Sequence, residues 1–394
     1  MDFYQNLLVA FRGFGRLARL CDCQGLCTIH FLEVHQVKIL ILKVQTIGDT
    51  LLTSRLISNL KAYHPDAMID VMVNEGTQQM LSLNTEVNRM FEYKRESQRG
   101  LSNWQRLTSD IHFLKSIRHA KYDLLIDLDE GDRGALIARI SGARIMVGSA
   151  TTTSQFLRNS YTHLLPKRDN RHTVEINLDV LKLLSIPIVD KHVRIFWSQE
   201  DEALVSKQLK NIDQFIHIHP FSKGCFKDVD IQTTAQIIDY CEQKLGVRVV
   251  IMAAPNPREL ERLQDILQLC ESSPLNLRGN LTLKQIAVLN QKASLFVGVD
   301  TAIMHISAAN DIPTLAFFGP TAPDTWGPWD NQLKSANYHR DGGLQCSGKH
   351  RVLSDNRSCL PCNKEGFDNS QVSDCLIGLN MNVIQSNIKD MLVS

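Results

Sequence analysis

Two stretches of the chain repeat one pattern, in which short apolar runs alternate with amphipathic segments. In the first stretch, apolar runs at 38–43, 67–73, 90–94, 122–128 and 144–148 predict buried strands. Helical spacing of apolar residues predicts a helix from Asp49 to near Pro65 and others at 104–120 and 132–140. Strands that alternate with helices in this way indicate crossover units and a parallel sheet.

The second stretch begins at Phe215 and is more regular. Its predicted strands are 215–219, 248–252, 275–277, 295–299 and 314–318, and its predicted helices are 231–245, 257–269, 283–292 and 301–309. We therefore expect an α/β protein with two Rossmann-like, doubly wound domains facing across a cleft. Because such sheets bind ligands at the carboxyl ends of their strands, the cleft is the expected site.

Polar stretches suggest four segments along the chain. We predict an N-terminal extension over 1–36, a first domain over 37–198 and a second domain over 199–345. A cysteine-containing segment over 346–394 follows, with a helix expected over 372–392.

The extension itself is open to three interpretations. Gly13, Gly15 and Glu33 superficially match a dinucleotide fingerprint, but too few residues follow for the crossover helix that such a site needs. Alternatively, Phe and Arg residues on different sides of an amphipathic helix could lie on an anionic membrane surface. We favour the third interpretation, a leader that is disordered or not native to the protein.

Composition narrows the class of protein. The 394 residues include 43 Lys and Arg and 42 Asp and Glu, so the formal net charge of +1 gives no basic field for nucleic-acid binding. An apolar share of 43% is typical of a chain that forms a core, and no run of eighteen apolar residues predicts a membrane-spanning helix. Ten scattered cysteines suggest the free thiols of a cytoplasmic protein.

Asp49 is the first candidate for chemistry, because it follows Gly48 at the end of a predicted strand and opens a helix. A helix N-terminus keeps a carboxylate ionised, and an ionised carboxylate can accept a proton from an alcohol. An N-cap role would also explain an aspartate here, and from position alone we favour that interpretation.

A loop after the first strand of the second domain carries Ser222, Lys223 and Lys227. Its hydroxyl and ammonium groups would lie at the carboxyl end of a sheet, where lysines suit a phosphate as point charges. A solvated loop explains the same residues equally well.

The most informative turn runs from Asp300 to His305. Thr301 and Ala302 begin a helix whose free N–H groups can bind an anion, and His305 shares a face with Thr301. Asp300 could cap this helix or bind ligand hydroxyls. His305 could equally be a satisfied core residue.

Two further features have structural explanations that we favour. Glu259 lies in the first turn of a predicted helix, where capping is favoured over a contact with ribose hydroxyls. Cys346, Cys359, Cys362 and Cys375 lie near His350, but only the Cys359–Cys362 spacing suits zinc, so free thiols are the default.

Taken together, these stretches resemble glycosyltransferase family 9, the bacterial lipopolysaccharide heptosyltransferases, and within it the heptosyltransferase III subgroup. The resemblance extends from residue 37 to the C-terminus. It rests on 38–60, 122–128, 172–175, 222–227, 277–320, 326–329 and 359–376.

The resemblance implies a GT-B fold and an inverting transfer of heptose from ADP-heptose, without a metal or other cofactor, to a lipid-linked core acceptor. By similarity, Asp49 is the general base, and Lys227 neutralises the diphosphate beside Ser222 and Lys223. It also assigns donor binding to Glu259, Asp300, Thr301, Ala302 and His305.

The acceptor implied by the resemblance is anionic and lies in the inner membrane, so we expect peripheral contact at the cytoplasmic face. Candidates for a basic acceptor face are Arg133, Arg139, Arg144, Arg158, Lys167, Arg168 and Arg171. The alternatives are an ADP-heptose transferase that acts earlier in the core, another type of nucleotide-sugar enzyme, or a non-catalytic nucleotide- or metal-binding module.

Overall fold

The computed structural model describes residues 36–93, 103–149, 151, 155–190, 192–210, 212–366 and 370–393, with side chains described from residue 112 onward in the segment that begins at 103. Residues 32–394 group into one compact unit. The fingerprint residues Gly13, Gly15 and Glu33 lie outside the described residues.

The first sheet is built from the predicted strands and one more. Its strands are β1 (Lys38–Lys43), β2 (Met68–Asn74), β3 (Arg89–Tyr93), β4 (Leu124–Asp127), β5 (Ile145–Ser149) and β6 (His163–Leu165). They are parallel and lie in the order β3-β2-β1-β4-β5-β6, which is that of a Rossmann sheet. The short strand β6 was not predicted, since none of its three residues is fully buried.

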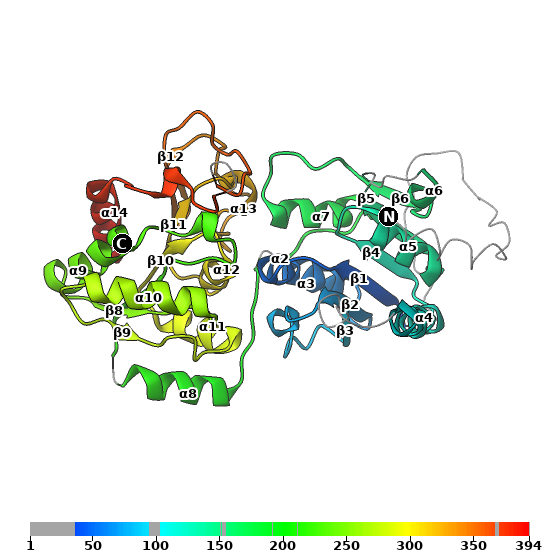
Figure 1. The fold of residues 1–394 in the computed structure, drawn as a ribbon. Coiled ribbons are helices and arrows are strands. Elements are labelled where there is room, and N and C mark those ends of the chain that lie inside the picture. Colours follow the sequence, from blue (N-terminus) through cyan, green and yellow to red (C-terminus); the bar gives the residue numbers. More distant parts are fainter. Residues whose placement is uncertain are drawn as a thin grey trace. The chain divides into compact units, whose positions relative to one another are not determined.

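Helices connect these strands, as Figure 1 shows. They are α2 (Ile47–Leu52), α3 (Ser54–Tyr63), α4 (Asn103–Ala120), α5 (Asp132–Ser141), α6 (Gln155–Arg158) and α7 (Thr173–Leu183), with a 3₁₀ turn η1 (Gln78–Met80). The helix predicted from Asp49 begins two residues earlier and divides at Thr53, which is the C-cap of α2 and the N-cap of α3.

The second sheet has the order β12-β13-β11-β10-β7-β8-β9. Its strands are β7 (Phe215–His219), β8 (Arg248–Ile251), β9 (Leu275–Asn276), β10 (Leu295–Val299), β11 (Thr314–Phe318), β12 (Gly343–Ser347) and β13 (His350–Ser354). Strands β12 and β13 form an antiparallel hairpin at one edge, and the other pairs are parallel. The apolar pattern predicted neither β12 nor β13. The edge strand β12 alternates between exposed and partly buried residues before Ser347.

The helices of this half are α8 (Gln199–Leu209), α9 (Ile231–Asp239), α10 (Pro257–Leu269), α11 (Leu283–Lys292), α12 (Ala302–Ala309), α13 (Pro323–Trp326) and α14 (Met381–Val393). Short turns of helix are η2 (Cys225–Lys227), the π-helical η3 (Tyr240–Lys244) and η5 (Asp374–Leu376). The helix predicted over 372–392 is wrong in its first part, because Gly378 has a left-handed φ of 67° and interrupts the helical path.

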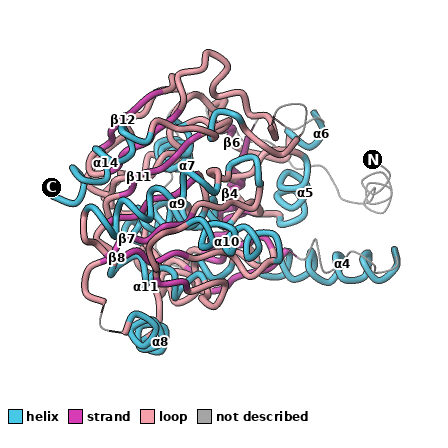
Figure 2. The backbone as a smooth tube through the Cα atoms, turned by 60° about the vertical axis from the view of Figure 1, so that its left-hand side comes forward, coloured by secondary structure: helices cyan, strands magenta, loops and turns pink. Residues whose placement is uncertain are grey.

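The C-terminal helix α14 belongs to the core of the second sheet. Its Ile384, Ile388 and Met391 share a hydrophobic cluster with residues of α9, β7 and β10. Figure 1 shows α14 in red near α9, and Figure 2 shows the helices in cyan and the strands in magenta.

Below, the first domain means β1 to α7 and the second domain means β7 to α14. The boundaries after 198 and 345 stay predictions. Ser198 is the N-cap of α8, while the sheet of the second domain continues to Ser354, beyond the predicted start of the C-terminal segment.

Candidate active site

The turn between β1 and α2 holds Asp49 through a capping box. Thr46 is the N-cap, and its Oγ1 accepts a hydrogen bond from the Asp49 N–H. In return, Asp49 Oδ2 accepts from the Thr46 hydroxyl at 2.7 Å and from the Thr46 N–H at 3.4 Å. The N-cap role considered for Asp49 is therefore wrong. Asp49 is the third helical residue, and the capping box fixes its carboxylate at the helix start.

A buried lysine supplies the charge that faces Asp49. Lys43 is the last residue of β1, its side chain is only 1% exposed, and its Nζ lies 3.2 Å from Asp49 Oδ1. Burial raises the pKa of Asp49, but Lys43 and the hydrogen bonds from Thr46 outweigh burial, so the net pKa lies below its usual value. Asp49 is thus a carboxylate at neutral pH.

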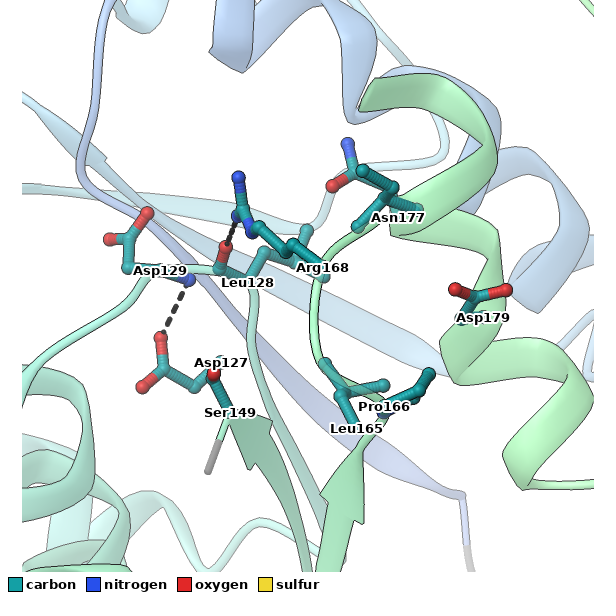
Figure 3. A pocket seen from close by; sticks show the side chains of 10 residues that line it. Asp127, Leu128, Asp129, Ser149, Leu165, Pro166, Arg168, Asn177 and Asp179 are labelled. Atoms are coloured by element: carbon teal, nitrogen blue, oxygen red, sulfur yellow. Dashed lines mark hydrogen bonds between the residues drawn. The ribbon is translucent and has the colours of Figure 1, made fainter. Parts of the chain in front are cut away.

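Lys43 also connects Asp49 to a small pocket in the first domain. Lys43 Nζ lies 3.9 Å from Asp129 Oδ1. With Asp127, Arg168, Asn177 and other residues, Asp129 lines a pocket where β4, β5 and β6 end beside α7 (Figure 3). Burial and the Asp129 charge raise the pKa of Asp127 to about 7. The carboxylates that follow β4 were a sequence signal for this pocket, because ligand sites form at such strand ends.

Several of the predicted basic residues are engaged with acidic neighbours. Arg168 Nε lies 3.3 Å from Glu130 Oε1. Arg168 also donates a hydrogen bond to the Leu128 carbonyl, which Figure 3 shows as a dashed line. Arg133 lies 3.8 Å from Asp129, and Arg171 binds Asp179. Their charges are therefore partly balanced within the first domain.

In the second domain, Lys227 pairs with Asp300. The Lys227 Nζ lies 3.0 Å from Asp300 Oδ2, joining the loop after β7 to the turn after β10. Lys227 is the last residue of η2, next to Asp228. Ser222, at the start of this loop, is buried, whereas Lys223 is exposed.

The turn after β10 is capped by Thr301, not by Asp300. Thr301 Oγ1 accepts from the Ile303 N–H at 3.0 Å, and Ala302 is the first residue of α12. The cap considered for Asp300 is therefore wrong, and its carboxylate is instead available for Lys227. Since the eight-residue α12 starts beside this ion pair, its free N–H groups add to the local positive potential.

Glu259 has both carboxylate oxygens engaged at the start of α10. Its Oε2 accepts from the Ala254 N–H at 2.7 Å, and its Oε1 accepts from Asn256 Nδ2 at 3.0 Å. Asn256, rather than Glu259, is the N-cap of this helix. Glu259 therefore links the first turn of α10 to the residues that precede the helix.

The site residues of the two domains meet where α2 lies against α12. A Cβ placed on Gly48 would lie 2.8 Å from the His305 Cδ2, so glycine permits the imidazole to lie close to this turn. Burial lowers the pKa of His305, while Asp300 and Asp49 act in the opposite direction. The fold thus brings together Asp49, Lys227, Asp300, Thr301 and His305. Glu259 instead contacts Ala254 and Asn256, and Lys223 is exposed in its loop.

A second contact between the domains joins residues that the sequence did not predict to lie together. His172, the N-cap of α7, accepts from the Val174 N–H through Nδ1, so its Nε2 carries the proton and donates to the Gly327 carbonyl at 2.9 Å. The Trp329 ring lies 5.0 Å from the His172 ring and 4.8 Å from the Arg55 guanidinium carbon. Burial lowers the pKa of His172 to about 3, so its imidazole is neutral at ordinary pH.

The cysteine-rich segment does not assemble metal ligands in the described part of the chain. Among the residues that the structure describes, no group of three or more His, Cys, Asp or Glu side chains is arranged to hold a metal ion. His350 is fully buried in β13, whereas Cys346 and Cys359 are exposed. Within the same ranges, no helix is both long and apolar enough to cross a membrane.

The two doubly wound α/β sheets are the arrangement of the GT-B fold. Comparisons with known proteins agree. The chain is 31% identical to lipopolysaccharide heptosyltransferase 3 of Escherichia coli over 73% of its length and 84% of that relative.

Solved structures show the same fold. A glycosyltransferase family 9 protein from Veillonella parvula superposes with a TM-score of 0.74 at 18% identity, covering 92% of this chain and 99% of that one. Escherichia coli heptosyltransferase WaaC with ADP gives 0.65 at 19% identity, covering 90% of this chain and 100% of that one.

The sequence model of glycosyltransferase family 9 (heptosyltransferase) matches residues 111–353. This chain belongs to that family and is a glycosyltransferase.

Proposed function

We propose that this protein transfers L-glycero-D-manno-heptose from ADP-heptose to a heptose of the lipopolysaccharide inner core, with inversion and in the manner of heptosyltransferase III. One observation carries the proposal. His305 lies against Gly48, next to Asp49, and is also close enough to the Lys227–Asp300 pair to feel its charges. One group accepts a proton and another balances phosphate charge, and a single displacement needs both functions.

On the acceptor side, Asp49 would take the proton of the attacking hydroxyl. Its lowered pKa keeps it ionised and ready, and Lys43 and Thr46 hold the carboxylate in place. A weak base is sufficient if the proton moves late, when the new glycosidic bond has made the hydroxyl strongly acidic. The acceptor oxygen then bonds to the anomeric carbon on the face opposite the departing ADP.

On the donor side, Lys227 would exchange its contact with Asp300 for the diphosphate. The bond between the anomeric carbon and the phosphate oxygen breaks with its electron pair, so negative charge grows on ADP. Lys227 and the N–H groups at the start of α12 would stabilise that charge, with Ser222 and Lys223 nearby in the loop. These groups balance the charge without requiring a metal ion.

The specificity is supported by two relatives. The similarity to Escherichia coli lipopolysaccharide heptosyltransferase 3 supports the transfer of heptose to lipopolysaccharide, and the WaaC structure, described as holding ADP, supports an ADP-linked donor. A lipid-linked core acceptor would bring the protein into peripheral contact with the cytoplasmic face of the inner membrane. Glu259 is the proposed partner of the ribose hydroxyls, for which one of its present hydrogen bonds would have to be exchanged.

The test is transfer in vitro, with ADP-heptose and core oligosaccharide isolated from a strain that lacks the corresponding gene. Mass spectrometry should show one added heptose, and linkage analysis identifies the acceptor hydroxyl. Addition only to a heptose-free core would indicate a transferase that acts earlier. Consumption of ADP-heptose without glycosylation would contradict the proposal and indicate another type of nucleotide-sugar enzyme.

Asp49→Asn in the same assay tests the general base. We expect kcat to fall by roughly 100-fold or more, because general-base catalysis contributes about 10²- to 10⁴-fold. The exposed Asp66→Asn is the matched control and should retain wild-type kcat. Wild-type activity of Asp49→Asn would remove Asp49 from the mechanism.

A further inference from the structure

We propose that Asp228 and Arg258 are positioning residues, which hold the 222–227 loop in the shape that presents Lys227 to the diphosphate. The inference rests on the proposed function of Lys227. It concerns two residues that neither the sequence pattern nor the resemblance singled out.

Asp228 closes the loop at its far end. Its side chain is 2% exposed, and its Oδ1 accepts from the Ser222 N–H at 2.7 Å, which joins the two ends of the loop. Because Asp228 follows Lys227 directly in the chain, any movement of the Asp228 backbone moves the lysine as well.

Arg258 bonds to both ends of the same loop from the first turn of α10. Its Nη1 donates to Asp228 Oδ2 at 2.7 Å, and its Nη2 donates to the Ser222 carbonyl. The planar guanidinium can bond to a carboxylate and a carbonyl at once in a fixed geometry, which a lysine cannot reproduce. Ser222 thus has its N–H bound by Asp228 and its carbonyl bound by Arg258.

The same arginine also reaches the nucleotide side of the proposed donor site. Its Nη2 lies 3.2 Å from Glu259 Oε1. However, Glu259 keeps its contacts with Ala254 and Asn256 independently of Arg258. Loss of the arginine should therefore disturb the diphosphate loop much more than the nucleoside contacts.

A neighbouring arginine provides the matched control. Arg262 lies one turn further along α10, and its Nε is 3.7 Å from the same Asp228 Oδ2, but no contact joins it to Ser222. If Arg258 acted only through its charge near Asp228, Arg262 would have a comparable effect. If it acts by shaping the loop, the two arginines will differ.

The experiment measures kcat, the KM for ADP-heptose, and the affinities for ADP and adenosine in Arg258→Gln, Arg258→Lys and Arg262→Gln. A misplacement of a catalytic group by about 1 Å lowers rates by up to about 100-fold, so we expect Arg258→Gln to lose at least about tenfold in kcat. ADP affinity should fall by about tenfold, the effect of one lost charge-assisted contact, and adenosine affinity should change by less than about twofold. Arg258→Lys should recover part of kcat, and Arg262→Gln should match the wild type.

Asp228→Asn tests the other partner of the loop. The amide can still accept one hydrogen bond but loses the charge that pairs with Arg258, so its kcat and ADP affinity should fall in the same direction as in Arg258→Gln. Unchanged values in this variant would contradict a role for Asp228.

A double variant separates positioning from a merely structural role. If Arg258 acts through Lys227, adding Arg258→Gln to Lys227→Met should lower kcat no further than Lys227→Met alone. Equal losses of ADP and adenosine affinity, or additive effects on kcat, would overturn the inference. Full activity of Lys227→Met alone would instead refute the proposed function of the lysine. An inactive Lys227→Met beside a normal Arg258→Gln would refute only the positioning role.

Discussion

Lys43 illustrates how one buried charge can determine the behaviour of several groups. Its ammonium lies between Asp49 and Asp129, at 3.2 and 3.9 Å, at the end of a strand that is almost wholly shielded from water. Removing one partner of a buried ion pair leaves the other partner uncompensated. The lysine therefore affects both the stability of the first domain and the protonation of the proposed base.

We predict that Lys43→Met shifts the acidic limb of the kcat/KM profile to higher pH. Lys43 lowers the pKa of Asp49, so without it the carboxylate becomes protonated at a higher pH and fails as a base there. The free energy of unfolding should also fall by about 3–5 kcal/mol. The measurements are pH–rate profiles and urea unfolding, with Lys38→Met in the same strand as a control. An unmoved acidic limb would argue against Asp49 as the titrating group.

Asp127 should make the protein less stable as the pH rises. Burial, followed by the charge of Asp129, raises the pKa of Asp127 to about 7 from its usual 3.8. Between these pH values the folded state binds more protons than the unfolded state, so this contribution to stability is complete below about 4 and is lost as the pH rises through 7.

The expected pH dependence can be measured by urea unfolding between pH 4 and pH 8. Asp127→Asn, which cannot ionise, should show a smaller loss of stability across this range. A parallel decline in both proteins would mean that other groups produce the effect.

At the scale of elements, the N-terminal turns of three helices hold the proposed base, the Asp300 partner of Lys227 and the positioning residue Arg258. Thr46 caps α2 and fixes Asp49, Thr301 caps α12 beside Asp300, and Asn256 caps α10 beside Arg258. All three helices follow parallel strands, so their positive ends lie at the carboxyl edges of the two sheets. This common geometry collects the site from distant parts of the chain.

The contact between α2 and α12 predicts the effect of Gly48→Ala. Alanine favours a helix over glycine, but its Cβ would lie 2.8 Å from the His305 ring, so the imidazole or the turn must move. We expect kcat to fall by about tenfold, because small displacements of reacting groups are costly, while the Tm changes little. Steady-state kinetics and thermal unfolding test this, and wild-type kcat would show that the contact is not needed for catalysis.

At the scale of the whole molecule, side chains far apart in sequence connect the two domains away from the proposed reactive groups. His172 and Arg55 of the first domain contact Gly327 and Trp329 of the second. Asn331 of the second domain accepts a hydrogen bond from the N–H of Val193, in the segment between α7 and α8, at 2.9 Å. These contacts hold the proposed base and the proposed phosphate-binding groups within one compact unit. A transferase that uses residues of both domains needs such a connection.

Trp329→Ala should therefore destabilise the whole molecule. Trp329 is 2% exposed, and loss of a buried tryptophan costs about 3–5 kcal/mol in unfolding free energy. Trp329→Phe keeps a ring beneath Arg55 and should cost less. Urea unfolding followed by circular dichroism compares the two. Equal losses would show that a phenyl ring cannot replace the indole of Trp329, which contradicts this expectation.

The fold class could be predicted from the sequence because each buried parallel strand is a short run of apolar residues. Strands β1, β7, β10 and β11 have the predicted bounds, and α10 and α11 do as well. Strand β12 and the break at Gly378 could not be predicted from apolar periodicity, since an exposed edge strand lacks an apolar run and a single φ angle leaves no periodic signal.

The sequence by itself identified the turns that follow the parallel strands, because the apolar periodicity of strands and helices is a property of neighbouring residues. It could therefore nominate Asp49, Lys227 and the 300–305 turn. Only the tertiary structure decided that Lys43 faces Asp49, that Arg258 bonds to both ends of the lysine loop, and that Gly48 lies against His305. These contacts join residues that are distant in the chain or on opposite sides of a turn. Their geometry depends on how the sheets twist and pack, and no local pattern of residues encodes it.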